Sequence, residues 1–292
     1  MNCQSLCALL LPTLVLLSGS LRTSGQTDPV QEWRFEAGSV QGGKLLASVG
    51  GLRGSMIGEY RFERDGELQF MRLVPSAKNP RTGGILLARD LKEARLPSKA
   101  FTAEAWVQID RTIEWGGIIG AVHDTGTHER GWILGYGEDQ FYFGLTAEKP
   151  GRMTYLRTPG NVVTGLWYHV AASYDGKEML LYLDGKLSAR HAGQEGPILQ
   201  PESPFYTIGA YRDDNDYYPF TGKLERISIW HRALAPEKIS QRYETRKAEF
   251  PGIETDVVEH PGKPADWVTW MGDNFRSGRA GEAIPLPLKK EP

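Results

Sequence analysis

A short loop around residue 214 carries four consecutive side chains that can bind a metal through oxygen. Asp213, Asp214 and Asp216 stand on either side of Asn215. Carboxylate and amide oxygens are the hard ligands that calcium prefers in proteins. The three aspartates are therefore the candidate metal ligands, with calcium as the candidate cofactor. The alternative is a surface turn whose acidic side chains face water.

The same loop places aromatic side chains beside the acids. Tyr211 and Arg212 precede the aspartates, Tyr217 and Tyr218 follow them, and Trp115 stands at a separate turn between strands. Flat aromatic faces offer apolar surface on which a sugar ring can stack. These five residues are the candidate ligand-binding residues, for a carbohydrate or a glycoconjugate. The alternative is that the rings pack on an adjacent strand of their own domain.

The acidic residues do not form the pairs that glycoside hydrolysis requires. Retaining glycosidases place two carboxyl groups about 5 to 5.5 Å apart. On a strand this requires acids two or four positions apart, because alternate residues share a face. Glu104 and Asp110 are six apart, Glu225 stands among apolar residues, and the acids of 59–67 are interleaved with arginines. The sequence therefore predicts no catalytic residues and a protein that is not an enzyme.

The first 25 residues have the pattern of a cleaved signal peptide. Residues 8–17 form an apolar run of about ten residues, which is the length of an h-region and too short to span a bilayer. Small residues follow, and we expect cleavage near Gly25. The mature chain is then secreted or periplasmic and contains no membrane span. An uncleaved N-terminal anchor is the alternative, because residues 1–7 carry no Lys or Arg.

Cysteine and charge content narrow the classes of partner. Cys3 and Cys7 are the only cysteines, and both lie in the expected signal peptide, so the mature chain has no disulfide. The chain has 34 Lys and Arg against 36 Asp and Glu, and it contains no basic block. Nucleic acid is therefore excluded as a partner, because binding it needs a dense basic footprint.

From residue 30 to residue 231, short alternating runs broken by Gly, Asp, Asn and Pro predict an all-β protein. In 101–109 the apolar residues alternate, so one face of this strand is expected to be core. Asp175-Gly176 and Asp184-Gly185 each predict a two-residue hairpin turn, hence a meander of three strands. Further strands are expected at 67–73, 85–89, 117–122, 132–136, 140–145 and 152–158.

Several sequence blocks, taken in order, resemble the laminin-G-like jelly rolls of the concanavalin A-like lectin/glucanase superfamily. The matching blocks are 101–107, 167–171, 181–186, 208–209 and 220–234, and the resemblance covers about Trp33 to Tyr243. It implies a two-sheet antiparallel jelly-roll sandwich with one short C-terminal helix, which begins at Pro236. Where the family carries an Asp-Glu pair, this chain has Glu225-Arg226, which counts against a calcium site that uses the second acid.

These observations predict three parts: a signal peptide at 1–25, a laminin-G-like β-sandwich at 26–249, and a Pro-rich tail or linker at 250–292. The predicted function is a non-catalytic secreted binding module that recognises carbohydrate through its edge loops. A protein-interaction or cell-envelope-associated module, with an extracellular protein as partner, is the main alternative. A glycoside hydrolase ranks third. No oligomeric state is predicted.

Overall fold

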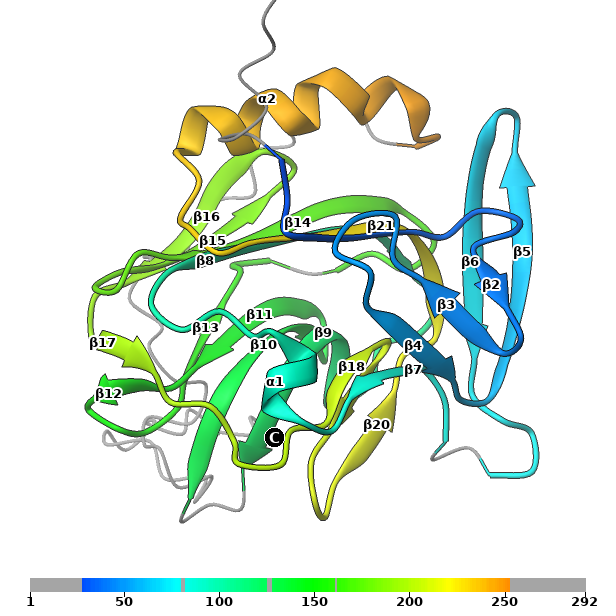
Figure 1. Cartoon of the computed structure of the whole chain (residues 1–292). Helices are drawn as coiled ribbons and strands as arrows, with labels where there is room; N and C mark the ends of the chain where they lie inside the picture. Colours follow the sequence, from blue (N-terminus) through cyan, green and yellow to red (C-terminus); the bar gives the residue numbers. More distant parts are fainter. Residues whose placement is uncertain (1–27, 80–81, 125–127, 161, 253–292) are drawn as a thin grey trace, which may run out of the picture.

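Two large antiparallel sheets form the body of the protein (Figure 1). The computed structural model describes residues 28–79, 82–124, 128–160 and 162–252. Within these ranges the two sheets have eight and nine strands, and two further pairs of short strands flank them. The predicted β-sandwich is confirmed. The expected signal peptide and the tail beyond residue 252 lie outside the described residues.

The eight-stranded sheet has the order β16-β15-β14-β8-β21-β6-β5, with β1 also pairing with β21. Its strands are β1 (Gln31–Arg34), β5 (Glu59–Asp65), β6 (Leu68–Val74), β8 (Phe101–Ile109), β14 (Trp167–Tyr174), β15 (Met179–Leu183), β16 (Lys186–His191) and β21 (Gly222–Trp230).

The nine-stranded sheet has the order β13-β11-β10-β9-β18-β7-β4-β3-β2. Its strands are β2 (Val40–Gln41), β3 (Lys44–Leu46), β4 (Arg53–Met56), β7 (Ile85–Ala88), β9 (Gly116–Asp124), β10 (Glu129–Gly137), β11 (Gln140–Leu145), β13 (Thr154–Arg157) and β18 (Tyr206–Ile208). The two short pairs are β12 (Ala147–Lys149) with β17 (Glu195–Ile198), and β19 (Ala210–Arg212) with β20 (Tyr217–Pro219). The helical segments are α1 (Leu91–Ala94), α2 (Pro236–Arg246) and the 3-10 turn η1 (Lys247–Glu249).

Strand β8 is buried on both of its faces. Phe101, Ala103 and Ala105 point into the core between the sheets, as the alternation predicts. Glu104 and Trp106 point the opposite way and are also buried. Figure 1 shows the reason, because α2 lies across the outer side of this sheet. The expectation of one core face therefore holds, but the second face is not a solvent face.

Helix α2 begins at Pro236, as predicted, and Ala235 before it provides no side-chain cap. Proline fits the first helical turn because its missing N–H would have no partner there. Tyr243 stacks on Trp106 with 5.9 Å between ring centroids, and Phe250 stacks on the same indole at 3.9 Å. Burial of these rings holds the helix on the sheet.

A buried ion network lies beneath α2. Arg242 donates two hydrogen bonds to the Glu104 carboxylate, of 2.6 and 2.9 Å. His169 Nε2 lies 3.4 Å from the same carboxylate. Burial alone would raise the pKa of Glu104, but the charges and hydrogen bonds of His169 and Arg242 outweigh it and lower the pKa to about 2. Glu104 is therefore an ionised anchor for the helix.

The two Asp-Gly turns of the meander differ from each other. Asp184 and Gly185 both have positive φ, of 48° and 74°, and they form the predicted two-residue turn between β15 and β16. Asp175-Gly176 is not such a turn. Four residues separate the paired ends of β14 and β15, and the Asp175 carboxylate accepts hydrogen bonds from the backbone N–H groups of Lys177 and Glu178. An aspartate side chain that caps its own turn favours this longer loop.

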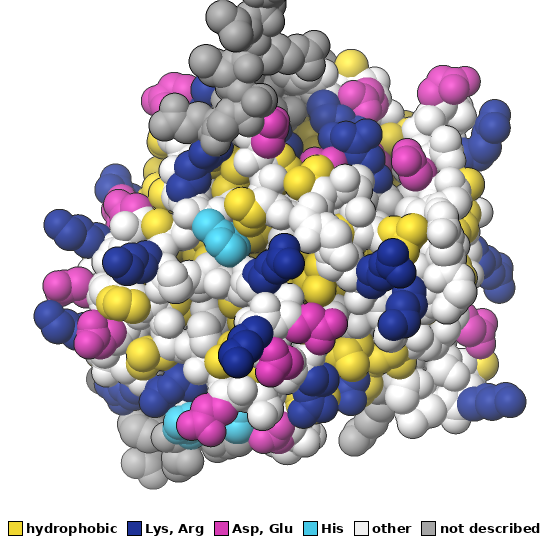
Figure 2. Space-filling view, viewed as in Figure 1, with side chains coloured by type: hydrophobic (Ala, Val, Ile, Leu, Met, Phe, Trp, Pro, Cys, Tyr) yellow, Lys and Arg dark blue, Asp and Glu magenta, His cyan; other side chains and the backbone are white. Residues whose placement is uncertain are grey.

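The surface carries both signs of charge. Figure 2 shows acidic and basic side chains interspersed across one face of the molecule, with apolar groups scattered among them. In the part of the chain that the structure describes, no helix is long and apolar enough to span a membrane.

Candidate functional site

Five aromatic side chains gather on the face of the nine-stranded sheet that points away from the core. On β11, Phe141 and Phe143 point into the core, whereas Tyr142 between them points outward and packs in a separate cluster. We define the aromatic cluster as the rings of Trp115, Tyr142, Tyr155, Tyr211 and Tyr218. Tyr142 and Tyr211 are buried and form its floor, whereas the other three are partly exposed.

Glycines on neighbouring strands make room for the two tyrosines of the sheet. Gly135 is directly opposite Tyr142 in the register, and a Cβ at Gly135 would lie only 2.5 Å from that tyrosine ring. Gly144 is opposite Tyr155, and a Cβ there would lie 2.8 Å from its ring. Both rings therefore occupy space that a side chain at these two glycines would fill.

The hairpin of β19 and β20 supplies two more rings. A Cβ at Gly117 on β9 would overlap the backbone of Ala210, so β19 crosses directly over this glycine. Tyr211 and Tyr218 are partners in the hairpin register and share one face, with 6.0 Å between ring centroids. This close crossing brings both tyrosines to the outer face of the sheet.

Trp115 lies at the centre of the cluster. Its ring centroid is 5.0 Å from that of Tyr155, 5.4 Å from that of Tyr142 and 5.9 Å from that of Tyr211. The geometry is tilted or edge-to-face, which aromatic pairs prefer. A partly exposed indole held by three tyrosines is a rigid apolar surface, and such a surface loses little conformational entropy when a ligand binds.

Polar groups border these rings. The Tyr155 hydroxyl donates a 2.9 Å hydrogen bond to the carboxylate of Asp124. Burial raises the pKa of Tyr155 well above its usual value, and so do the neighbouring Tyr211 and Asp124. Arg157 lies beside the rings of Trp115 and Tyr142, with its guanidinium carbon 5.2 and 5.3 Å from their centroids. The cluster thus combines flat apolar faces with hydrogen-bond donors, which is the composition of small-ligand sites.

Three of the five predicted ligand-binding residues come together, and two do not. Trp115, Tyr211 and Tyr218 belong to the aromatic cluster. Arg212 and Tyr217 are register partners on the opposite face of the hairpin, because side chains alternate along a strand. Arg212 stacks on the Tyr217 ring at 4.6 Å, and the Tyr217 hydroxyl donates a hydrogen bond to the Gly83 carbonyl.

The three aspartates have different surroundings. Asp213 is 4% exposed, and its carboxylate accepts hydrogen bonds from the backbone N–H groups of Asn215, Asp216 and Asp124. Asp214 is 56% exposed at its side chain and lies 3.5 Å from His123 Nε2. Asp216 accepts a hydrogen bond from the Tyr218 hydroxyl. Among the described residues, no group of three His, Cys, Asp or Glu side chains could hold a metal ion. The calcium site stays a prediction.

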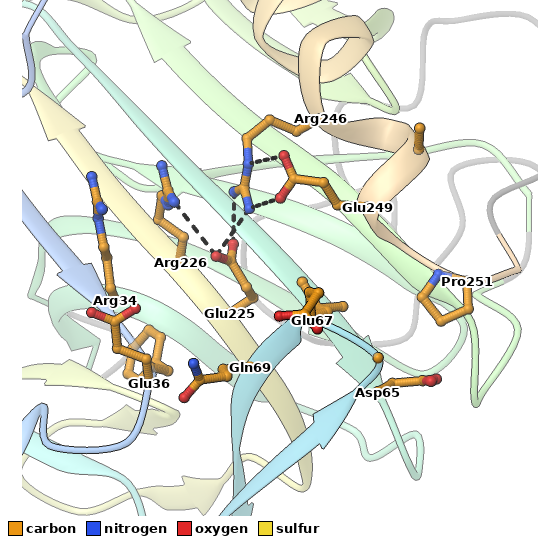
Figure 3. A pocket seen from close by; sticks show the side chains of 14 residues that line it. Arg34, Glu36, Asp65, Glu67, Gln69, Glu225, Arg226, Arg246, Glu249 and Pro251 are labelled. Atoms are coloured by element: carbon orange, nitrogen blue, oxygen red, sulfur yellow. Dashed lines mark hydrogen bonds and ion pairs between the residues drawn. The ribbon is translucent and has the colours of Figure 1, made fainter.

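A pocket of 640 Å³ lies beside α2 and the β5–β6 hairpin, away from the aromatic cluster (Figure 3). Arg246 pairs with Glu225 through hydrogen bonds of 2.7 and 3.0 Å, and it also pairs with Glu249. Arg226 lies 3.6 Å from Glu225. Glu225, which the sequence places among apolar residues, therefore joins β21 to the end of α2. These pairs stabilise the position of the helix.

Sequence reasoning missed Tyr142, Tyr155 and Arg157. They lie on β11 and β13, far in sequence from the acidic loop at 213–216. The available signal was the recurrence of glycine at 131, 135 and 137, which leaves three positions on one face of this strand without side chains, with Ile133 between them. Such a face must be covered by large neighbours or by a ligand.

Comparison with known proteins places the fold in a family. A family model described as the concanavalin A-like lectin/glucanases superfamily, of laminin-G type, matches residues 82–240. This is more than half of the 292 residues, and the chain belongs to this superfamily. Pappalysin-1 of Mus musculus is 26% identical over 170 residues, which cover 54% of this chain and 10% of that protein. The human pappalysin-1 is 24% identical over 167 residues, again over 10% of its length. The chain therefore matches only about a tenth of the length of these relatives.

Solved structures share the fold at low sequence identity. The binding domain of Paraclostridial Mosquitocidal Protein 1 has a TM-score of 0.54 and 13% identity, covering 75% of this chain and 52% of that one. Domain 4 of AbnA, an extracellular arabinanase of Geobacillus stearothermophilus solved with arabinotriose, has a TM-score of 0.52 and 17% identity, covering 73% and 97%. The botulinum neurotoxin serotype G binding domain has a TM-score of 0.52 and 14% identity, covering 76% and 52%. The chain thus shares its fold with the binding domains of two toxins and with an arabinanase domain solved with arabinotriose.

Proposed function

We propose that this protein is a non-catalytic carbohydrate-binding module whose site is the aromatic cluster. The observation that carries the proposal is the position of Trp115, which is partly exposed and is held by the rings of Tyr142, Tyr155 and Tyr211. A sugar ring has apolar C–H faces and a polar rim, so it matches a flat aromatic surface with hydrogen-bonding groups at its edge.

The surroundings of the cluster support binding over mere packing. A purely structural cluster would bury its largest ring, but Trp115, Tyr155 and Tyr218 all keep part of their surface exposed. The same fold in domain 4 of AbnA occurs with a bound arabinotriose. That likeness concerns the fold, and the site proposed for this chain depends on its own residues.

We also propose that the protein acts outside the cytoplasm, after cleavage near Gly25. The support is the apolar run at 8–17 followed by small residues. N-terminal sequencing of the exported protein tests this proposal, which predicts a mature chain that begins near residue 26. A product that retains Met1 would contradict it.

A glycan array tests the carbohydrate proposal with two matched variants. Trp115→Ala removes the central ring of the cluster and is expected to lower the signal of the retained glycans at least tenfold. Tyr217→Ala removes a ring from the same hairpin, on the face that points away from the cluster, and is expected to leave the signal unchanged.

The other outcomes are equally informative. If Tyr217→Ala abolishes binding and Trp115→Ala does not, the ligand lies on the Arg212 face of the hairpin. If the wild-type protein retains no glycan, the carbohydrate proposal is wrong, and a protein-interaction module becomes the better interpretation.

A further inference from the structure

Two arginines stack on one phenylalanine ring beside the paired strands β7 and β18 (Figure 1). Arg89 follows β7, Phe205 precedes β18, and Arg212 ends β19. The guanidinium carbon of Arg89 lies 3.5 Å from the centroid of the Phe205 ring, and that of Arg212 lies 4.3 Å from the same centroid. Because both distances are measured from one point, the two guanidinium carbons are at most about 8 Å apart. We call Arg89 and Arg212 the arginine pair.

The rings that hold the pair are themselves fixed. Phe205 is buried. The guanidinium carbon of Arg212 also lies 4.6 Å from the ring of Tyr217, its register partner in the hairpin. The Tyr217 hydroxyl donates a 2.6 Å hydrogen bond to the Gly83 carbonyl and accepts one of 3.3 Å from the Gly83 N–H. Arginines that stack on fixed rings are partly ordered before a ligand arrives, so they lose less conformational entropy when they bind.

The arginine pair lacks a carboxylate partner. Among the residues that the structure describes, neither guanidinium makes an ion pair or a hydrogen bond. The carboxylates next to them in sequence are engaged elsewhere. Asp90 accepts hydrogen bonds from two backbone N–H groups at the start of α1, and buried Asp213 accepts them from its own loop. Two like charges this close repel each other, so an anion that contacts both is favoured.

The donors of the pair are open to solvent. Arg89 is exposed, and Arg212 is half-buried with none of its side-chain nitrogens shielded from solvent. The other stacked arginines differ in one respect or another. Arg242 and Arg246 already face carboxylates, and the unpartnered nitrogens of Arg157 are buried. Accessible donors, a shared ring and the lack of a carboxylate therefore distinguish the arginine pair.

We propose that the arginine pair binds a tetrahedral oxyanion, the group of a sulfate or a phosphate, which contacts both guanidinium groups. A guanidinium that stacks on a ring keeps the N–H donors in its plane available for an oxyanion. In such a contact the central atom of the anion lies roughly 4 Å from the guanidinium carbon. One anion can therefore reach both arginines across their separation. A tetrahedral group has enough oxygens to accept from both, whereas one arginine occupies both oxygens of a carboxylate.

This site is separate from the proposed carbohydrate site. Arg212 and Tyr217 lie on one face of the β19–β20 hairpin, and Tyr211 and Tyr218 of the aromatic cluster lie on the other. Binding of an oxyanion and retention of a glycan are therefore independent readouts, and either can fail without the other.

NMR of the arginine Nε–H groups tests the proposal directly. The full chain is titrated with sodium sulfate and, separately, with sodium phosphate and sodium acetate, all at an ionic strength held constant with sodium chloride. We expect the Nε–H signals of Arg89 and Arg212 to shift together and to saturate, with a Kd of about 1 mM or tighter for sulfate or phosphate. Acetate should bind at least tenfold more weakly. The tighter of the two tetrahedral anions identifies the source of the charge.

Three variants separate a built site from general surface charge. Arg212→Gln should weaken binding at least tenfold, because one of the two guanidinium groups is lost. Arg212→Lys keeps the charge but loses the planar fork, and should weaken binding about three- to tenfold. Arg64→Gln is the matched control, because Arg64 is an exposed arginine on β5 far in sequence from the pair, and it should leave the Kd unchanged. Thermal unfolding shows whether each variant is folded.

Three results would overturn the proposal. The first is the absence of saturable shifts at Arg89 and Arg212 with either tetrahedral anion up to about 20 mM, well above the expected Kd. The second is an equal loss of binding in Arg64→Gln and Arg212→Gln, which would reflect the overall charge of the protein. The third is acetate that binds as tightly as sulfate and phosphate, since the pair would then not select a tetrahedral group.

Discussion

Replacing Glu104 by glutamine removes a buried negative charge while it keeps almost the same shape. Glu104 lies under α2 and is hydrogen-bonded twice by Arg242, with His169 nearby. Burial alone would raise the pKa of Glu104, but its charged neighbours lower it from 4.5 to about 2. Glutamine can accept a hydrogen bond but cannot carry the charge that Arg242 faces.

The size of the effect follows from that pKa. Each tenfold change in acid strength corresponds to about 1.4 kcal/mol, so a pKa of about 2 instead of 4.5 contributes about 3 kcal/mol to the free energy of unfolding. The folded pKa is lower than the unfolded one, so this contribution is fully present above pH 4.5. It is lost as the pH falls toward 2, because protonation then favours the unfolded chain.

Urea denaturation at pH 7 and at pH 3 measures this contribution. We expect Glu104→Gln to lose about 3 kcal/mol at pH 7, and less than half of that at pH 3. Glu178→Gln is the control, because Glu178 pairs with Arg190 on the surface, where such pairs contribute about 0 to 1 kcal/mol. An equal loss from Glu104→Gln at both pH values would refute the reasoning, since the loss would then come from packing rather than charge.

Three further changes probe the site and the helix. Gly117→Ala should lower the free energy of unfolding by about 1–3 kcal/mol and weaken glycan binding, because a Cβ there overlaps the backbone of Ala210. Chemical denaturation measures the loss of stability, and the glycan array measures the loss of binding. Phe250→Ala should lower the same free energy by about 3 kcal/mol, because Phe250 is buried against Trp106, and unchanged stability would show that α2 is held without it. Asp213→Ala should lower it by about 1–3 kcal/mol by leaving backbone N–H groups unpaired, whereas the exposed Asp214→Ala should change it by less than about 0.5 kcal/mol. A calcium-dependent rise in melting temperature that Asp214→Ala abolishes would instead support the calcium hypothesis.

Alternation along the chain made most of the fold predictable. The strand at 101–109 matches the prediction residue for residue, and the helix begins at Pro236 as expected. Both features depend on signals within a few residues. Alternation of apolar residues indicates a strand, and proline at the first helical turn indicates the start of a helix. The loop at Asp175 was predicted wrongly because its carboxylate caps the turn and replaces the expected geometry.

The site was only partly predictable because it depends on register between distant strands. Tyr211 and Tyr218 were predicted as site residues because the loop 211–218 combines acids with tyrosines. Trp115 was predicted because it stands at a turn between strands. No local pattern indicates that Tyr142 and Tyr155 lie over Gly135 and Gly144, since that requires the pairing of three strands. Tyr217 and Tyr218 lie on opposite faces of the hairpin because side chains alternate along a strand. The prediction treated 211–218 as one loop and therefore grouped the two tyrosines.

A crystal structure with the glycan that the array retains best tests the central claim most directly. We predict a sugar ring stacked on the partly exposed Trp115, in contact with Tyr155 or Tyr218. A glycan bound elsewhere, on the Arg212 face of the hairpin or in the pocket beside α2, with Trp115 bare, would contradict it.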